Sequence, residues 1–295
     1  MSQTGAEGPA GGGPAAGGPA PALWLEAVRI RGDEFLHRDR YPFDVPALQG
    51  LQEMRFEANV AFLVGENGSG KSTLIEAIAR RCDLHIWAPA KRTRPPVRAA
   101  GGSAAGSAGA AGGVAAGSAG SAARPGGAAQ EFSFSARALG EFVDVSLPRG
   151  PVKGGVFSAE SFREWAEFID DVSELDPGQA KYHGGEKLTL RSRGEGLLAY
   201  FRGRYRIPGL YFLDEPEAAL SPASQLELLR LLTDHRRRGH AQFVIATHSP
   251  LLMAVKGAQV FALGDGPIRT TSYQETEHYR LYRDFFADPE QFTAE

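Results

Sequence analysis

Short apolar runs that end at a glycine or at polar residues recur along the chain. Three of them are Asn59–Val64 (NVAFLV), Leu210–Leu213 (LYFL) and Phe243–Ala246 (FVIA). An uninterrupted run of about four to eight apolar residues is typical of a strand that is buried on both faces. Each run therefore predicts a buried strand. Near the C-terminus, Val260–Leu263 and Ile268–Tyr273 flank a Gly-Asp-Gly turn sequence, which predicts a hairpin.

Apolar residues recur at helical spacing between the predicted strands. In segments 72–81 and 161–175 they return about every three or four positions, as on one face of a helix. The first segment carries Leu74, Ile75 and Ile78. The second carries Phe162, Trp165, Phe168, Ile169, Val172 and Leu175. Both segments are therefore predicted helices.

Capping signals mark the two ends of a third predicted helix. Ser221 is a favourable N-cap, Pro222 is a favourable first residue, and Gly239 follows as a C-cap. Between them a stripe is formed by Leu226, Leu229 and Leu232. A fourth helix is predicted over Glu275–Phe286, with one side formed by Tyr279, Tyr282 and Phe286. Strands separated by helices predict an α/β fold with a largely parallel sheet.

The composition is that of a folded protein with one main domain. The chain has 295 residues, of which 42% are hydrophobic, and this is enough to build a buried core. The net charge of −3 gives no support for a globally basic nucleic-acid binder. A single cysteine, Cys82, excludes an intrachain disulfide and a cysteine-based zinc site. Because the chain lacks a long apolar stretch and a secretory signal, we expect a cytoplasmic protein with no transmembrane segment of its own.

Two stretches differ from the rest in composition. Residues 1–22 are mainly Gly, Ala and Pro and are expected to form a disordered tail. Residues 23–295 are expected to form one domain, interrupted at 91–130 by a flexible insertion that is mostly Gly, Ala and Ser. The insertion begins with the basic segment Lys91–Arg98. We favour a solvated loop for it, and a basic arm for nucleic acid or acidic partners is the alternative.

The strongest chemical motif is a glycine-rich loop. Its sequence, Gly65-Glu66-Asn67-Gly68-Ser69-Gly70-Lys71-Ser72, fits the pattern G-x-x-x-x-G-K-[ST] and lies between a predicted strand and a predicted helix. Glycines let the backbone wrap tightly and direct its N–H groups at phosphate oxygens. We expect this loop and the adjoining Thr73 to bind nucleotide phosphates. Lys71 would reach the β- and γ-phosphates, and Ser72 would ligate Mg²⁺.

Two further motifs follow apolar runs. Asp214 and Glu215 come directly after the run at 210–213. A carboxylate at such a strand end holds Mg²⁺, and its neighbour polarises the attacking water, so we assign these roles to Asp214 and Glu215 respectively. His248 follows the run at 243–246, where an imidazole is suited to contact the γ-phosphate. Lys71, Glu215 and His248 are therefore the candidate catalytic residues.

With these motifs, residues 23–295 outside the insertion resemble the ABC class of P-loop ATPases. Within that class the chain is most similar to small stand-alone bacterial predicted ATPases, often labelled AAA-family. The segments that carry the resemblance are Val64–Ser72, Ala159–Phe162, Leu213–Pro222, Gln242–Leu252 and Thr276–Tyr279. The resemblance implies an ABC-type P-loop NTPase fold. In such a fold a mostly parallel central sheet has flanking helices and a small helical subdomain, here at about 158–206.

The resemblance also implies a homodimer that sandwiches ATP. In this class two subunits close head to tail, and each ATP lies between one P-loop and the partner's signature motif. Ser192-Arg193-Gly194-Glu195-Gly196 is similar to that signature, so Ser192, Gly194 and Glu195 are expected to meet the nucleotide across the interface. Arg193 stands where the usual signature has Gly, and an Arg supplied in trans can itself reach phosphate. Ser192 and Glu195 also form a good capping box, and both roles use the same helix end.

Other positions of the class pattern are matched in part. Glu160 lies about where the class has a metal-sensing glutamine and is assigned as a third candidate metal ligand. Ser221 stands where the dimer-contacting loop of the class usually ends in Asp. The candidates for the aromatic residue that stacks on adenine are Trp24, Phe35 and Tyr41, and a place in the core is the favoured alternative for each.

The function implied by the resemblance is Mg²⁺-dependent ATP binding and hydrolysis, coupled through the dimer to an unknown protein or nucleic-acid partner. One alternative is a slow nucleotide-dependent binding switch that acts on nucleic acid or an effector protein. A second is the ATPase subunit of a membrane transporter. A third, a DNA-repair or chromosome-maintenance ATPase, is disfavoured because no sustained heptad pattern appears. Motifs that the whole class shares do not identify the biological process.

Overall fold

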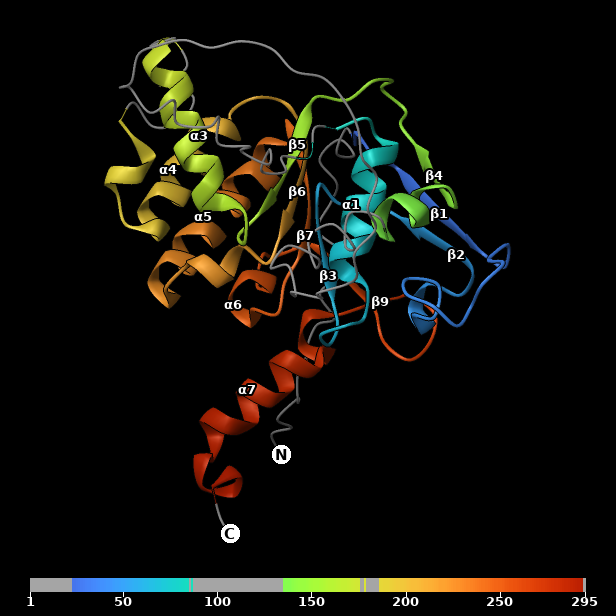
Figure 1. Ribbon diagram of the computed structural model, residues 1–295. Helices are drawn as coiled ribbons and strands as arrows, with labels where there is room; N and C mark the ends of the chain where they lie inside the picture. Colours follow the sequence, from blue (N-terminus) through green and yellow to red (C-terminus); the bar gives the residue numbers. More distant parts are fainter. Residues whose placement is uncertain (1–22, 85, 87–134, 176–177, 179–185, 294–295) are drawn as a thin grey trace, which may run out of the picture.

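The computed structural model describes residues 23–84, 86, 135–175, 178 and 186–293. Figure 1 shows a larger sheet with helices on both faces and a smaller sheet beyond helix α1 (Lys71–Arg81). The predicted tail at 1–22 and the predicted insertion at 91–130 lie outside the described residues. The domain boundaries expected from the sequence therefore stay predictions.

The larger sheet confirms the predicted α/β fold. Its strands lie in the order β5 (Gly154–Ser158), β6 (Gly209–Asp214), β7 (Ala241–Ala246), β3 (Val60–Val64), β8 (Gln259–Ala262) and β9 (Arg269–Thr271). Neighbouring strands are parallel from β5 to β8, and β9 is the antiparallel partner of β8. The three predicted buried strands are β3, β6 and β7, and the predicted hairpin is β8–β9.

The central strands are apolar throughout because both of their faces are covered. Along β3, Ala61 and Leu63 belong to the core on one side of the sheet, and Phe62 belongs to the core on the other side. These three side chains are fully buried. Since successive side chains of a strand point to opposite faces, one uninterrupted apolar run supplies both cores.

A second sheet, which the apolar runs did not predict, consists of three antiparallel strands. They are β2 (Gly50–Arg55), β1 (Ala27–Gly32) and β4 (Val143–Ser146), in that spatial order. In β1, Val28 and Ile30 are buried and the intervening Arg29 is exposed, which is the alternation of a strand with one covered face. The covered face packs on α1, so that α1 lies between the two sheets (Figure 1).

The other face of the larger sheet carries four helices. They are α3 (Phe162–Leu175), α4 (Arg193–Arg204), α5 (Pro222–Arg238) and the short α6 (Pro250–Met253). The capping prediction for α5 is confirmed. The Ser221 hydroxyl accepts a hydrogen bond from the Ser224 N–H at 3.2 Å, and Gly239 ends the helix with a φ of 67°.

The buried face of α5 differs in part from the predicted stripe. Leu228 and Leu232 are fully buried, whereas Leu226, which was expected in the stripe, is 39% exposed. Five leucines lie between positions 226 and 232, so helical spacing alone allows more than one stripe. Packing of α5 against β7 and α6 determines that the buried stripe is the one that contains Leu228.

The buried face of α3 also differs from the prediction. Phe168 and Leu175, both expected on the apolar face, are exposed, and Asp170 is buried instead. The Asp170 carboxylate accepts hydrogen bonds from the backbone N–H groups of Leu188 and Thr189 at 2.8 and 2.9 Å. These bonds satisfy the buried carboxylate, and they fasten α3 to the segment that precedes α4.

The last α-helix, α7 (Glu277–Ala287), projects from the body of the molecule (Figure 1). The predicted helix over Glu275–Phe286 is interrupted at Thr276, because this residue is extended and caps α7. Several apolar side chains are exposed along the helix: Leu281, Tyr282, Phe285 and Phe286. The first turn of α7, by contrast, lies close to α6 and the edge of the larger sheet.

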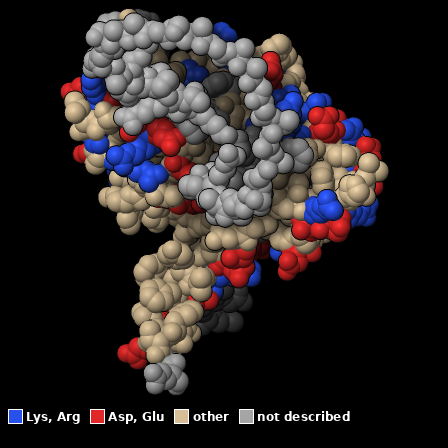
Figure 2. Space-filling model, in the orientation of Figure 1, with Lys and Arg blue, Asp and Glu red and all other residues tan. Residues whose placement is uncertain are grey.

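The surface carries both signs of charge. Figure 2 shows Lys and Arg side chains interspersed with Asp and Glu on the face drawn, in keeping with the net charge of −3. Among the described residues, no helix is both long enough and apolar enough to cross a membrane. Cys82 is buried without a disulfide partner, and burial raises the pKa of its thiol to about 12.

We predict that His235 makes folding sensitive to acid. Burial, followed by the nearby His240 and Arg238, lowers the pKa of His235 from 6.5 to about 4, so the folded protein holds a neutral ring. The unfolded chain binds a proton below pH 6.5 and the folded chain does not. The contribution of neutral His235 to the free energy of unfolding is fully present above pH 6.5. It is lost as the pH falls towards 4, by up to about 3 kcal/mol.

Denaturant unfolding between pH 7.5 and 4 tests this prediction in His235→Phe, which keeps the ring contacts with Tyr205 and Phe243. The variant should lose stability less steeply than the wild type over this range. His37→Phe, at an exposed position, is the control and should follow the wild type. If the free energy of unfolding falls equally steeply with pH in all three proteins, His235 is not the source of the acid sensitivity.

Candidate functional site

The three sequence motifs meet at one edge of the larger sheet. Leu63 in β3 pairs with Ala246 in β7, and Ala246 also pairs with Asp214 in β6. Because these strands are parallel, the segments that follow them leave the sheet on the same side. The fold therefore brings together the glycine-rich loop, the two acids and His248, as a ligand site at the carboxyl ends of parallel strands requires.

The glycine-rich loop is closed by Lys71, the first residue of α1. Its Nζ donates hydrogen bonds to the carbonyl oxygens of Gly65 and Glu66 at 2.8 and 3.0 Å. Gly68 and Gly70 have φ angles of 84° and 86°, in the left-handed region that glycine favours. Burial lowers the pKa of Lys71, while the carboxylates of Glu215 and Asp214 act in the opposite direction.

One hydroxyl in this loop fits a phosphate ligand. The Ser69 Oγ is buried and has no hydrogen-bond partner among the described residues. A buried polar group without a partner costs free energy, so a donor in this position favours binding of an acceptor such as a phosphate oxygen. The loop, the N-terminus of α1 and Ser69 thus suit the nucleotide phosphates expected from the sequence.

Ser72 and Asp214, the two main metal-ligand candidates, are in direct contact. The Ser72 hydroxyl donates to Oδ1 of Asp214 at 2.8 Å. Burial raises the pKa of Asp214 to about 7, although the Ser72 hydrogen bond and the Lys71 charge oppose the shift. A carboxyl group with so little solvation is stabilised as a carboxylate by a bound cation, and Mg²⁺ prefers oxygen ligands of this kind. These residues therefore fit the ion.

Glu160, the third candidate metal ligand, lies beyond the end of β5. It lies two residues beyond Ser158, which pairs with Asp214 at the end of β5, and its side chain is exposed. Within the described part of the chain no group of three or more His, Cys, Asp and Glu side chains is arranged to hold a metal ion. A Mg²⁺ ion at Ser72 and Asp214 would thus take its other ligands from water and phosphate, as is usual for this ion.

Glu215 stands in a constrained turn at the end of β6. Its backbone has a φ of 45°, which is uncommon for a residue other than glycine, and its N–H donates to the Ala246 carbonyl at 3.0 Å. The side chain is 44% exposed, and its Oε1 lies 3.6 Å from Nε2 of His248. Strained backbone of this kind is common where a side chain must be aimed at a reacting group.

Two residues near His248 were not singled out from the sequence. Oε1 of Glu217 accepts a hydrogen bond from the backbone N–H of His248 at 2.6 Å, and burial raises the pKa of Glu217. Nε2 of His278, in α7, lies 2.9 Å from Nδ1 of His248. Glu217 lies only two residues after Glu215 and was available as a signal in the sequence. His278 lies in the segment Thr276–Tyr279 that the resemblance includes, but its contact with His248 could not be read from the sequence, because 30 residues separate the two.

The signature-like segment forms the N-terminus of α4. The Ser192 hydroxyl accepts from the Glu195 N–H at 3.4 Å, and the Glu195 carboxylate accepts from the Ser192 N–H at 3.1 Å, so the capping box is confirmed. Gly194 packs near the Ala219 carbonyl, in the loop after the two acids. The guanidinium of Arg193 donates to the Ala159 carbonyl within the same subunit. Contact of Ser192, Gly194 and Glu195 with a nucleotide stays a prediction.

The three aromatic candidates for adenine stacking lie in different surroundings. Phe35 is buried in the core, as the alternative to stacking predicted, with its ring 4.8 Å from that of Phe43. Trp24 is half-buried under the guanidinium of Arg149. Tyr41 is 45% exposed, so the expectation of a core position is wrong for it. Its hydroxyl contacts Oγ1 of Thr73, which places Tyr41 beside the glycine-rich loop.

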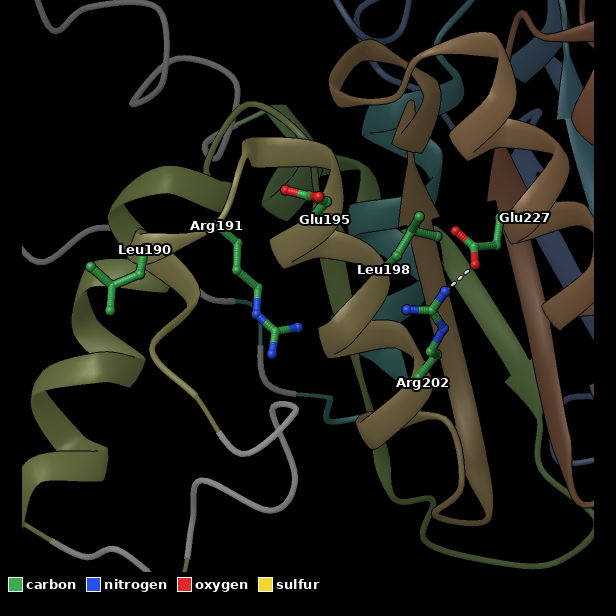
Figure 3. A pocket seen from close by; sticks show the side chains of 6 residues that line it. All are labelled: Leu190, Arg191, Glu195, Leu198, Arg202 and Glu227. Atoms are coloured by element: carbon green, nitrogen blue, oxygen red, sulfur yellow. Dashed lines mark hydrogen bonds and ion pairs between the residues drawn. The ribbon is translucent and has the colours of Figure 1, made fainter.

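A surface hollow of about 460 Å³ lies away from these motifs. Figure 3 shows that its lining comes from α4, α5 and the segment before α4: Leu190, Arg191, Glu195, Leu198, Arg202 and Glu227. An ion pair between Arg202 and Glu227 crosses one side of it. None of the lining residues belongs to the glycine-rich loop, β6 or β7. The hollow therefore lies apart from the glycine-rich loop and the two acids, and it shares only Glu195 with the signature-like segment.

Two family models match parts of the chain. The model described as "AAA domain, putative AbiEii toxin, Type IV TA system" matches residues 164–254, and a second model, described as "AAA domain", matches residues 46–81. The two matches include Lys71, Asp214, Glu215 and His248.

Named relatives extend the similarity over most of the chain. The ATP-binding protein EcfA2 of an energy-coupling factor transporter, from Lactobacillus delbrueckii subsp. bulgaricus, is 28% identical over 248 residues, which are 81% of this chain and 77% of the relative. A protein of Methanothermobacter thermautotrophicus named "Putative ABC transporter ATP-binding protein" is 26% identical over 250 residues, or 84% of this chain and 78% of the relative.

Two solved structures match this chain over most of its length. The SMC head domain from Thermotoga maritima matches with a TM-score of 0.42 and 17% identity, covering 85% of this chain and 99% of that one. The cbiO1 structure from Clostridium perfringens, part of the ABC transporter complex cbiONQ, matches with a TM-score of 0.46 and 14% identity, covering 90% and 97%.

We predict that Gly65 is required for the loop to close. A Cβ atom at this position would lie 2.1 Å from the Leu263 carbonyl oxygen, at the end of β8. Gly65→Ala should therefore lower the free energy of unfolding by more than about 1 kcal/mol and weaken nucleotide binding. Thermal unfolding and titration with a fluorescent ATP analogue measure the two effects.

The control for this prediction is Gly264→Ala, one residue beyond the clash, where a Cβ atom meets nothing within 4 Å. This variant should stay within about 0.5 kcal/mol of the wild type. Equal behaviour of the two variants would refute the steric argument.

Proposed function

Since the family models and the homologous sequences support an ABC-class P-loop ATPase, we propose that this protein binds ATP with Mg²⁺ and hydrolyses it. The observation that carries the proposal is the hydrogen bond from Ser72 to Asp214, at 2.8 Å. It joins the glycine-rich loop to the acid at the end of β6, which are the two parts of a P-loop ATPase site that share the metal ion.

The loop and the N-terminus of α1 would hold the phosphates of ATP. Backbone N–H groups of the loop, the Ser69 hydroxyl and the Lys71 ammonium supply positive charge and hydrogen-bond donors. When ATP binds, phosphate oxygens would replace the loop carbonyls as acceptors for Lys71. Ser72 and Asp214 would hold Mg²⁺, which when bound neutralises phosphate charge.

Glu215 is proposed as the general base. The Glu215 carboxylate is partly exposed and, unlike the Asp214 carboxylate, is not engaged by Ser72. The turn at the end of β6 directs it towards the edge of the sheet where the phosphates would lie. A carboxylate there accepts a proton from the attacking water. His248, whose Nε2 lies 3.6 Å from Glu215, is proposed to donate a hydrogen bond to the γ-phosphate.

A head-to-tail homodimer is the proposed working assembly. Ser192 and Glu195 at the N-terminus of α4 are not buried in the single chain, which leaves this helix end accessible to a second subunit. Backbone N–H groups at a helix N-terminus bind anions. ATP held on one P-loop and on the partner's α4 would therefore join two subunits, and hydrolysis would release them to act on a protein or nucleic-acid partner.

A second candidate function is the ATPase subunit of a membrane transporter. The relatives with the broadest coverage are named as transporter ATP-binding proteins, and this favours the candidate. Co-purification of the tagged protein from native membranes would support it if an integral membrane protein is recovered at equal stoichiometry. Recovery only from the fraction without membranes would favour the stand-alone enzyme.

We predict that Lys71→Ala weakens ATP binding by at least about tenfold, because the variant lacks the ammonium group that meets the phosphates. Equilibrium titration with ATP and Mg²⁺ measures the change. Lys256→Ala removes an exposed ammonium group outside the site and should bind ATP like the wild type. Unchanged binding by Lys71→Ala would reject the loop as the phosphate site.

We predict that Glu215→Gln binds ATP normally and turns it over about a hundredfold or more slowly, since an amide is a poor base. The variant should also persist as a dimer with ATP and Mg²⁺, which light scattering after size exclusion measures. Glu141→Gln, at an exposed turn, is the control. Normal turnover by Glu215→Gln would exclude Glu215 as the base, and ATP binding by the wild type with less than one turnover would favour a nucleotide-dependent switch.

A further inference from the structure

Local contacts fix the first turn of α7. Thr276 is buried, and its hydroxyl caps the helix by accepting from the Tyr279 N–H at 3.3 Å. The ring of Tyr279 packs edge-on against that of Tyr273, with 4.6 Å between the ring centres. These contacts lie on both sides of His278 in the sequence. Tyr273 in turn packs against the core and α7 contacts α6, so the fold sets the position of His278.

His278 meets His248 at Nδ1, the ring nitrogen other than the one that lies near Glu215. His278 Nε2 lies 2.9 Å from His248 Nδ1, and the two rings are steeply inclined, with centres 5.0 Å apart. This distance and this pair of atoms describe a hydrogen bond between two imidazoles, in which one ring must donate and the other accept.

The opposite nitrogen of His248 faces the candidate catalytic carboxylate. His248 Nε2 is buried, has no hydrogen-bond partner among the described residues, and lies 3.6 Å from Oε1 of Glu215. Carboxylate and phosphate oxygens only accept hydrogen bonds. A nitrogen that is to serve either of them must therefore carry a proton.

We propose that His278 is a positioning residue, whose Nε2–H donates to Nδ1 of His248 and thereby keeps the His248 proton on Nε2, directed at Glu215 and at the γ-phosphate. The inference rests on the proposed ATPase function for the phosphate contact and on the structure alone for the imidazole pair. In a neutral imidazole, the hydrogen bond made by one nitrogen decides which tautomer is present. His278 thus acts through His248 and does not touch the phosphate.

The charges around the pair agree with two neutral rings near pH 7. Burial, followed by the Lys71 ammonium and by His278, lowers the pKa of His248, while Glu215 and Glu66 act in the opposite direction. Burial also lowers the pKa of His278, together with Lys71 and against Glu66 and Glu277. Two neutral imidazoles can share one hydrogen bond, whereas two imidazolium ions would each present a donor.

A purely structural role for His278, in which it only holds α7 against the body, predicts different results. With such a role, any substitution that preserves the helix would also preserve activity. The effect of substituting His278 would then not depend on His248. The experiment therefore needs a substitution that mimics the donor and a background without His248.

The kinetic test compares His278→Ala, His278→Gln and the wild type. The alanine variant should lower kcat by about tenfold or more, as loss of an outer partner of a functional histidine does, with the KM for ATP within about twofold. The glutamine amide places a donor near the former Nε2 and should restore most of kcat. Arg280→Ala, an exposed substitution in the same helix turn, is the control and should match the wild type.

A double-mutant cycle isolates the path through His248. In a His248→Ala background, His278→Ala should change kcat no further, because its effect passes through the missing ring. An equal loss in both backgrounds would overturn the proposal, and so would a glutamine variant no better than alanine. Either result would show that His278 only holds α7 against the body of the protein.

Histidine tautomers in ¹⁵N-labelled protein give a readout that does not need hydrolysis. The wild type should hold His248 in the Nε2–H form, and His278→Ala should give a mixture of the two tautomers, with His278→Gln close to the wild type. An unchanged His248 tautomer in the alanine variant would overturn the proposal even if ATPase activity is present. If the wild type shows no ATP turnover at all, the proposed function fails, and the tautomer measurement still decides the positioning role.

Discussion

The parallel register of β3, β6 and β7 is the constraint on which the site depends. Asp214 pairs with Ala246, and Ala246 with Leu63, so the segments after the three strands emerge together. A shift of one residue in any of them would reverse which side chains face each core. The buried faces that hold this register are supplied by apolar runs such as VAFLV in β3. The same strand register is therefore required both for packing of the cores and for the placement of the candidate site residues.

Burial at this edge produces the electrostatic character of the site. It lowers the pKa of Lys71 and raises the pKa of Asp214 to about 7, well above the usual range of a carboxyl group. A P-loop ammonium and a metal-binding carboxylate are most effective in a poorly solvated site, where their charges are less screened. The free energy that this arrangement costs is offset by the apolar cores on both sides of the sheet, and binding of Mg²⁺ and phosphate would relieve it.

Sequence patterns predicted those parts of the fold that local rules control. The central strands, the caps of α5 and the glycine-rich loop were recognised because each has a short signature in contiguous residues. The second sheet was missed, since β1 alternates buried and exposed residues over only six positions. The α5 stripe was misassigned because five leucines within 226–232 fit more than one helical face. In such cases packing partners distant in the sequence make the choice.

By itself, the sequence indicated the candidate residues at the start of α1 and at or just beyond the ends of β6 and β7: Lys71, Ser72, Asp214, Glu215 and His248. Only the tertiary structure decided that Ser72 touches Asp214, that Tyr41 lies at Thr73, and that His278 meets His248. The physical reason is distance along the chain. Loop and strand signatures are local, whereas a hydrogen bond between residues 30 or 142 positions apart exists only after both elements have packed on the same sheet.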